Sequence, residues 1–166
     1  MSWIDSHVHL WTQNTVRYPV VRGSDVSNYE PKEFTPEILF RYARPSKVYR
    51  AVLVHMGIYG KDLGLMLDAL YRYPDVFRIV GMVDPANPSV ADDMKGCLES
   101  GVTGFRIVAT SDDASNWLQL PGYNTIFRTA AQTGQAICPL VHPSGIPEIS
   151  RMCGEYPDTV VVLDHM

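Results

Sequence analysis

Apolar and polar positions along the chain alternate between two kinds of segment. Short, nearly continuous apolar runs have the length and β-branching of buried strands, and between them apolar residues recur at the three- and four-residue spacing of a helix face. The predicted strands lie within residues 3–11, 51–56, 77–83, 102–108, 136–141 and 159–163. The predicted helices lie within residues 36–44, 62–73, 88–100, 123–133 and 147–156.

This order of elements predicts the fold class. Strand and helix alternate six times, and strands that are apolar on both faces must be covered on both sides. That pattern is typical of an α/β protein with a parallel sheet built from right-handed βαβ units. The 166 residues are 46% hydrophobic, and no linker or low-complexity segment interrupts them, so we expect a single domain over residues 1–166.

Charge and composition narrow the possible partners. The net charge of -4 argues against a nucleic-acid surface or a polybasic membrane patch. No apolar window approaches the length of a membrane span, and the N-terminus opens into a strand pattern rather than a signal peptide, so we expect a cytoplasmic protein. The three cysteines are widely spaced within apolar patterns, which favours reduced core residues over a disulfide framework.

The first strand carries the densest group of chemically active side chains. Asp5, His7 and His9 are two residues apart, and alternate residues of a strand point to the same face. Two imidazoles on one face at a strand end can grip a divalent cation. Asp5 could bind directly or orient a histidine from behind. An incidental histidine pair stays open at this point.

Polar residues also mark the ends of the other predicted strands. Ligands bind at the carboxyl ends of parallel strands, both in barrels and in open α/β sheets. All five histidines of the chain fall at such ends. The residues at these positions are His7, His9, His55, Asp84, Arg106, His142, Asp164 and His165.

Each of these positions also has a structural explanation. His142 precedes a proline and could hydrogen-bond a turn, while His55 could line a pocket or satisfy a carbonyl in the core. Arg106 lies in an apolar strand, where a buried guanidinium needs an anionic partner, either a structural carboxylate or a substrate. His165 follows an apolar run, which favours a functional position over a frayed tail. We assign Trp11, His55 and Arg106 to substrate binding.

Six motifs together resemble a known family. They are the segments 3–11, 70–74, 78–85, 101–106, 139–143 and 162–165. In combination they are similar to the amidohydrolase-related (amidohydrolase-2) branch of the amidohydrolase superfamily. That group contains sugar-acid lactonases, the pyrone-dicarboxylate lactonase and decarboxylases of the aminocarboxymuconate-semialdehyde type.

The resemblance implies a (β/α)8 TIM-type barrel with its site at the strand carboxyl ends. His7, His9 and His142 match the family's histidine ligands of a divalent metal, zinc with manganese as the alternative, and a metal-free variant of the chemistry stays open. His165 matches the histidine that handles the attacking water or the substrate. Arg106 matches the position that holds a substrate carboxylate or oxygen.

The chain departs from the family in its length. About six βα units are present, and strands seven and eight are absent together with the aspartate that follows the eighth. Asp164 belongs to the sixth strand and does not replace that aspartate. We therefore expect a truncated piece of a longer enzyme, or a homo-oligomer in which a second chain covers the open strand edges.

The predicted function is a hydrolase that opens a lactone or related cyclic ester of a sugar acid or carboxylic acid. Its expected partner is a small molecule bearing a carboxylate or a lactone, with no nucleic acid and no membrane. Two alternatives remain at this stage. One is a metal-dependent decarboxylase of an unsaturated or aromatic acid, and the other is an inactive truncated barrel that serves as a folded or oligomeric module.

Overall fold

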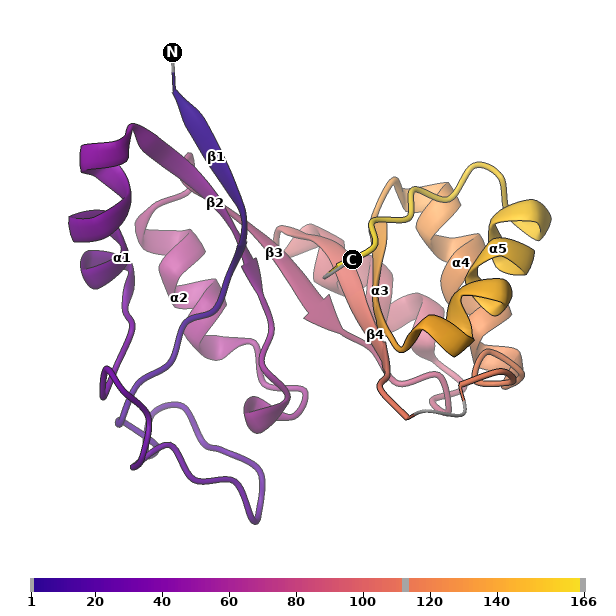
Figure 1. The fold of residues 1–166 in the computed structure, drawn as a ribbon, viewed down its shortest axis with the longest axis horizontal. Coiled ribbons are helices and arrows are strands. Elements are labelled where there is room, and N and C mark those ends of the chain that lie inside the picture. The colour runs from indigo at the N-terminus through magenta and orange to yellow at the C-terminus, as the bar shows by residue number, and fades with distance from the viewer. Residues whose placement is uncertain (1, 112–113, 165–166) are drawn as a thin grey trace. The chain divides into compact units, whose positions relative to one another are not determined.

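The structure, a computed structural model, describes residues 2–111 and 114–164. The chain forms two compact units, Met1–Gly81 and Met82–Met166, and each is described by itself (Figure 1). The expectation of a single domain over the whole chain stays a prediction.

Three parallel strands form the sheet of the first unit, β1 (Trp3–Val8), β2 (Val48–Val54) and β3 (Phe77–Met82). β1 pairs with β2, and β2 pairs with β3 through the register Ala51↔Phe77 to Val54↔Val80. Leu53 and Ile79 are fully buried in this sheet. The predicted strands are thus confirmed, although β2 begins three residues earlier than the apolar pattern indicated.

Two helices follow the strands of this unit, α1 (Pro36–Ala43) and α2 (Gly64–Arg72). Thr35 takes the N-cap position of α1 and Pro36 the first helical position, as predicted, but the Thr35 side chain makes no capping hydrogen bond. The predicted apolar face of α2 is partly wrong. Tyr71 is 88% exposed, whereas Leu65 and Ala69 are buried, because the helix turns a face one residue away from the predicted one to the core.

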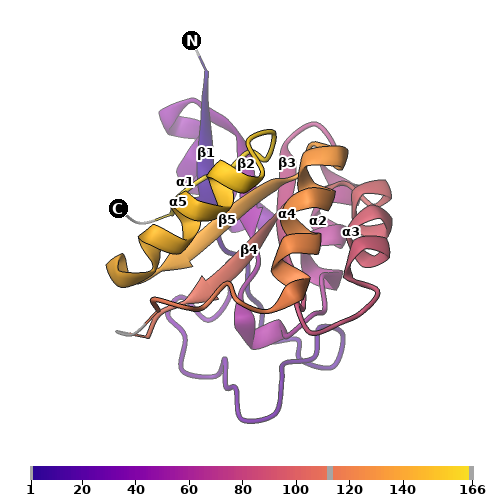
Figure 2. The ribbon, with the colours of Figure 1, turned by 90° about the vertical axis from the view of Figure 1, so that its right-hand side faces the viewer.

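The second unit contains α3 (Val90–Glu99), β4 (Val102–Ala109), α4 (Pro121–Thr133), β5 (Ala136–Val141) and α5 (Ile146–Glu155). β4 and β5 run parallel, side by side, in the register Gly104↔Ala136 to Ala109↔Val141 (Figure 2). α4 ends at Gly134, whose φ of +72° is the left-handed conformation that glycine adopts most readily. Residues 2–111 and 114–164 also contain three short 3-10 helices, η1 (Arg44–Ser46), η2 (Gly57–Tyr59) and η3 (Pro143–Gly145).

The predicted strand over residues 159–163 is wrong in extent. Only Val161 forms a bridge, parallel to Ile137 of β5. Ile137 N–H donates to the Val160 carbonyl, and Val162 N–H donates to the Ile137 carbonyl, both at 2.9 Å. The next donor of this parallel ladder belongs to Pro139, which has no N–H, so the ladder is interrupted there.

The segment 12–34 after β1 forms no helix or strand, as its punctuation by proline and glycine predicted. An antiparallel bridge between Trp11 and Phe34 closes it at its base. Gln13 Nε2 donates to the carbonyls of Val26 and Lys32 at 2.6 and 2.7 Å, and these bonds hold the loop together from inside. No helix within the described residues is both long and apolar enough to span a bilayer.

Candidate functional site

His7 and His9 lie at the carboxyl end of β1, and their imidazole rings are in contact. The two Nε2 atoms are 3.3 Å apart, and the rings meet edge to face with centroids separated by 4.9 Å. Both side chains are half-buried. The alternation of a strand therefore brings the pair together as the sequence predicted.

A backbone carbonyl of the neighbouring strand determines which nitrogen of His9 carries the ring proton. His9 Nδ1 lies 2.7 Å from the Val54 carbonyl oxygen. A carbonyl can only accept, so Nδ1–H donates and the Nε2 lone pair is directed toward His7. A histidine that binds a metal through Nε2 usually donates its Nδ1–H to a carbonyl or a carboxylate, as His9 does here.

The spacing of the pair fits a shared ion. Two nitrogen ligands at about 2.0–2.1 Å from a tetrahedral zinc lie about 3.3–3.4 Å apart, and the Nε2 atoms of His7 and His9 already have this separation. In the metal-free neutral pair, His7 Nε2–H donates to His9 Nε2. The Nε2 atoms of His7 and His9 are therefore spaced to serve as two of the ligands of a divalent cation.

Asp5 supports the pair through the backbone. Its Oδ1 accepts the main-chain N–H of His7 at 3.1 Å, and its side chain is exposed. This bond reaches the backbone of His7 and not an imidazole, so both roles considered for Asp5 stay predictions.

His55 follows β2 and is buried, with 2% of its surface exposed. Its Nε2–H donates to the Gly60 carbonyl at 2.9 Å, and its backbone N–H donates to the Val80 carbonyl at 2.9 Å. Burial lowers the pKa of His55, which keeps the ring neutral near pH 7. The structure thus supports the hydrogen-bonded core alternative, and substrate contact by His55 stays a prediction.

Arg106 is buried in the middle of β4, with 6% of its surface exposed. Its Nη2 lies 3.2 Å from Asp164 Oδ2, and the two side chains are 7% and 12% exposed. The sequence placed both residues at strand ends, which is wrong for Arg106, because three residues of β4 follow it. The sequence did not pair the two residues. Cys138 lies beside this ion pair, and burial together with the Asp164 charge raises the pKa of its thiol to about 11.

His142 follows β5 and caps η3. Its Nδ1 accepts the Ser144 backbone N–H at 3.3 Å and lies 3.0 Å from Ser144 Oγ, which itself accepts the Ala114 N–H. This arrangement places the proton of the neutral ring on Nε2, in contrast to His9. Binding a metal through Nε2 requires that proton on Nδ1, where Ser144 Oγ can accept it. Sequence reasoning foresaw the turn but did not single out Ser144.

Two predicted site residues remain to be placed. Trp11 donates from Nε1 to the Pro31 carbonyl at 2.8 Å and stacks on Phe34, so its ring fastens the 12–34 loop, and its contact with substrate stays a prediction. His165 lies outside the described residues.

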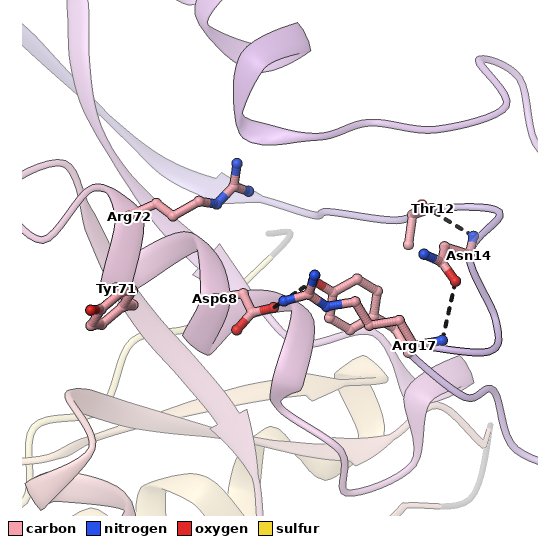
Figure 3. A pocket seen from close by; sticks show the side chains of 7 residues that line it. Thr12, Asn14, Arg17, Asp68, Tyr71 and Arg72 are labelled. Carbon is pink, nitrogen blue, oxygen red and sulfur yellow. Dashed lines mark hydrogen bonds and ion pairs between the residues drawn. The ribbon is translucent and has the colours of Figure 1, made fainter.

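A hollow of about 530 Å³ opens on the first unit, between the 12–34 loop and α2. Figure 3 shows the Arg17 side chain reaching Asp68, where the Nη2–Oδ2 distance is 2.6 Å. Tyr18 donates to the same oxygen, and Arg72, at the rim, pairs with Glu37. The charges of these groups are paired with one another. The bonds of Arg17 and Tyr18 to Asp68 attach the 12–34 loop to α2.

Within each unit, the described residues contain no cluster of three or more His, Cys, Asp or Glu side chains that could hold a metal. The first unit supplies the His7–His9 pair, and the second supplies His142 and the Arg106–Asp164 ion pair. A common site for His7, His9 and His142 stays a prediction.

Parallel strands that alternate with helices, with a metal-competent histidine pair at the end of the first strand, are typical of α/β proteins that bind ligands at the strand carboxyl ends. The model of the amidohydrolase family matches residues 4–166. The chain belongs to this family, which confirms the resemblance seen in the motifs. No curated protein matches the chain.

Solved structures share the fold at low sequence identity. A probable 2-pyrone-4,6-dicarboxylic acid hydrolase from Acinetobacter baumannii, with citric acid bound, is 19% identical with a TM-score of 0.78. An amidohydrolase from Burkholderia multivorans with bound zinc is 17% identical with a TM-score of 0.76. The 5-carboxyvanillate decarboxylase from Novosphingobium aromaticivorans, with bound manganese, is 16% identical with a TM-score of 0.62.

These matches cover 99% of this chain for the first two structures and 98% for the third. The chain spans 58% of the length of the first two proteins and 65% of the third. The fold class predicted from the sequence, part of a (β/α)8 barrel, is confirmed.

Proposed function

We propose that the chain belongs to a hydrolase that opens a lactone or related cyclic ester of a sugar acid or carboxylic acid with a histidine-bound divalent metal. The observation that carries this proposal is the His7–His9 pair, whose Nε2 atoms are 3.3 Å apart while His9 Nδ1 is held by the Val54 carbonyl. Family membership supports the proposal, and so does the likeness in fold to the probable 2-pyrone-4,6-dicarboxylic acid hydrolase.

The proposed metal ligands are His7, His9 and His142. Zinc is the first choice and manganese the alternative, in line with the ions bound in the Burkholderia and Novosphingobium proteins. Such an ion acts as a Lewis acid that polarises a carbonyl and makes water acidic enough to attack near neutral pH. His142 joins this set when Ser144 Oγ accepts its Nδ1–H.

The substrate carboxylate is assigned to Arg106. A guanidinium can bind two carboxylates through different N–H groups, so Arg106 can keep Asp164 through Nη2 and still orient a substrate acid. His165 is proposed to orient the attacking water. The acid substrate named for the Acinetobacter protein supports a carboxylate-bearing ligand for this chain.

The test combines metal analysis with a substrate panel. We expect the purified full chain to carry zinc or manganese and to open sugar lactones or pyrone carboxylates. Ring opening is measured by the release of protons. His7→Ala and His9→Ala should each lower zinc affinity at least about tenfold, as loss of one ligand removes more than loss of an outer-shell partner does. Asp25→Asn, an exposed change within a turn of the 12–34 loop, is the matched control.

Three results would overturn the proposal. A chain without zinc or manganese that opens no ring would refute it outright. Equal zinc affinity in the His7→Ala and Asp25→Asn variants would remove the histidine pair from the metal site. Release of carbon dioxide from an aromatic acid, without ring opening of any lactone, would replace the hydrolase with the decarboxylase alternative.

A further inference from the structure

The segment 54–60 runs from the last residue of β2 to Gly60, the residue after η2, and it contacts both the His9 ring and the chain that follows His9. The Val54 carbonyl accepts His9 Nδ1–H at 2.7 Å. Five residues later, the Tyr59 hydroxyl accepts the backbone N–H of Thr12 at 3.2 Å. The His9 ring and the main chain three residues beyond it are therefore fastened to one short segment, which we call the His9 clamp.

The two contact points of the clamp come from different parts of the segment. Val54 lies in the sheet, where it pairs with Val80 of β3. Tyr59 belongs to the 3-10 turn, which local bonds close on itself, Tyr59 N–H to the Met56 carbonyl and Gly60 N–H to the Gly57 carbonyl. These local bonds shape the turn but do not tie its far end to the strand.

The side chain of His55 makes that connection. Its Nε2–H donates to the Gly60 carbonyl at 2.9 Å, and its own backbone N–H is bonded to Val80 in the sheet. Gly60 has φ +59° and ψ -113°, a conformation that suits glycine, and a Cβ on it would lie 2.6 Å from Val21 Cγ1. The backbone conformation of Gly60 thus determines where its carbonyl lies, and the His55 side chain donates a hydrogen bond to that carbonyl.

We propose that His55 is a positioning residue, which closes the His9 clamp and so holds the His9 ring with Nδ1 on Val54 and Nε2 toward His7. In this role His55 acts through the Gly60 carbonyl and the turn. The importance of this role for catalysis rests on the proposed function, because His55 would affect the reaction through the proposed metal ligands His7 and His9. The geometric claim stands on the metal-free chain and can be tested there.

A buried core histidine with no link to the site is the competing explanation. It predicts that loss of the His55–Gly60 bond lowers stability and leaves His9 unchanged. The clamp predicts a change at His9 itself. A loosened turn releases Tyr59 and with it the main chain at Thr12, so the His9 ring can leave the Val54 carbonyl and adopt the other tautomer. A spectroscopic measurement of His9 therefore separates the two.

The experiment compares three variants of the full chain. His55→Leu removes the bond, His55→Gln restores an amide donor of similar reach, and Gln135→Leu is the control. Gln135 is 1% exposed and donates to the carbonyls of Met94 and Val102, so its loss disturbs a buried hydrogen-bond site in the other unit. The readouts are the ¹⁵N spectrum of labelled histidines without metal and zinc affinity by competition with a chelator.

We expect His55→Leu to shift the His9 ring nitrogens toward a mixture of tautomers and to weaken zinc binding by about tenfold to a hundredfold, the range for outer-shell partners of metal-binding histidines. In His55→Gln the ring signals of His9 should return to their wild-type positions. Gln135→Leu should lower the free energy of unfolding and leave the His9 signals unchanged. An unchanged His9 spectrum in a folded His55→Leu chain overturns the proposal.

A second pair of variants decides the question if His55→Leu does not fold. Gly60→Ala displaces the turn against Val21, whereas Gly134→Ala introduces a side chain at a similar positive φ, +72°, with nothing within 4 Å. We expect the ¹⁵N signals of the His9 ring to shift in Gly60→Ala and to keep their wild-type positions in Gly134→Ala. Identical His9 signals in the two variants would refute the clamp. A wild-type chain that binds neither zinc nor manganese and opens no ring would refute the proposed function, while the metal-free spectra would still test His55.

Discussion

The interrupted pairing beside β5 leads to a prediction that one substitution can test. Pro139→Val supplies the N–H that the parallel ladder lacks, opposite the Val162 carbonyl. The flanking bonds are already present, from Ile137 N–H to Val160 and from Val162 N–H to Ile137, both at 2.9 Å, while Asp164 N–H lies 3.4 Å from the Pro139 carbonyl. We expect the new bond to extend the single bridge at Val161 into a short strand.

Two opposing terms determine the size of the effect. A new backbone hydrogen bond contributes about 0.5–1.5 kcal/mol net. Replacing proline restores conformational freedom to the unfolded chain, which costs about 0.4–1 kcal/mol. The free energy of global unfolding should therefore change by less than about 1 kcal/mol. Local opening of the 160–164 segment should cost about 1 kcal/mol more, which slows amide exchange roughly fivefold.

The measurement is amide hydrogen exchange followed by NMR, with a denaturant titration for the global free energy. In Pro139→Val, the new amide at position 139 and the amides of Val162 and Asp164 should be protected. Leu140→Val is the control, because position 140 belongs to the alternate set of β5 residues, whose backbone groups face β4. An amide at position 139 that exchanges like an unpaired loop amide would refute this explanation of the missing strand.

Four further predictions concern single residues. Ser144→Ala removes the hydroxyl beside Nδ1 of His142, and ¹⁵N spectra should then show a changed ratio of its ring tautomers; an identical spectrum would argue against this hydrogen bond. Because the pKa of Cys138 is raised to about 11, its alkylation at about pH 8 should be slower than that of the other two cysteines and should accelerate as the pH approaches 11, whereas equal rates would contradict the burial. The raised pKa adds stability below the ordinary thiol pKa, which is lost as the pH rises toward 11. Gly96→Ala, on the exposed face of α3, should raise the free energy of unfolding by about 0.5–1 kcal/mol. Gly122→Ala, whose Cβ would lie 1.8 Å from a backbone carbonyl, should lower it by about 1–3 kcal/mol. Denaturant titration checks both signs, and a neutral Gly122→Ala would show that the neighbouring loop gives way.

The elements that were predicted best are those bounded by local signals. β5 spans Ala136–Val141 as expected, since Gly134 ends the preceding helix and Pro143 follows the strand. The segment 159–163 has an equally apolar pattern but forms no full strand, because the missing donor lies on its neighbour and not within the segment. Pairing partners are not part of a local pattern, and so this error could not be avoided from periodicity.

The same distinction holds for the candidate site. His7 and His9 are two residues apart in one strand, so their common face followed from the sequence. The partners that set their chemistry are distant along the chain, since 45 residues separate His9 from the Val54 carbonyl. Arg106 likewise finds Asp164 across 58 residues.

By itself, the sequence determined the alternation of strands and helices and the histidine pair, because residue spacing along a regular backbone decides which side chains share a face. The family followed from the resemblance of its motifs to those of known proteins. The tertiary structure alone decided which ring nitrogen of His9 carries a proton, which carboxylate meets Arg106, and where the pairing beside β5 stops. These depend on the hydrogen-bonding groups of neighbouring strands, and only folding brings those groups within reach.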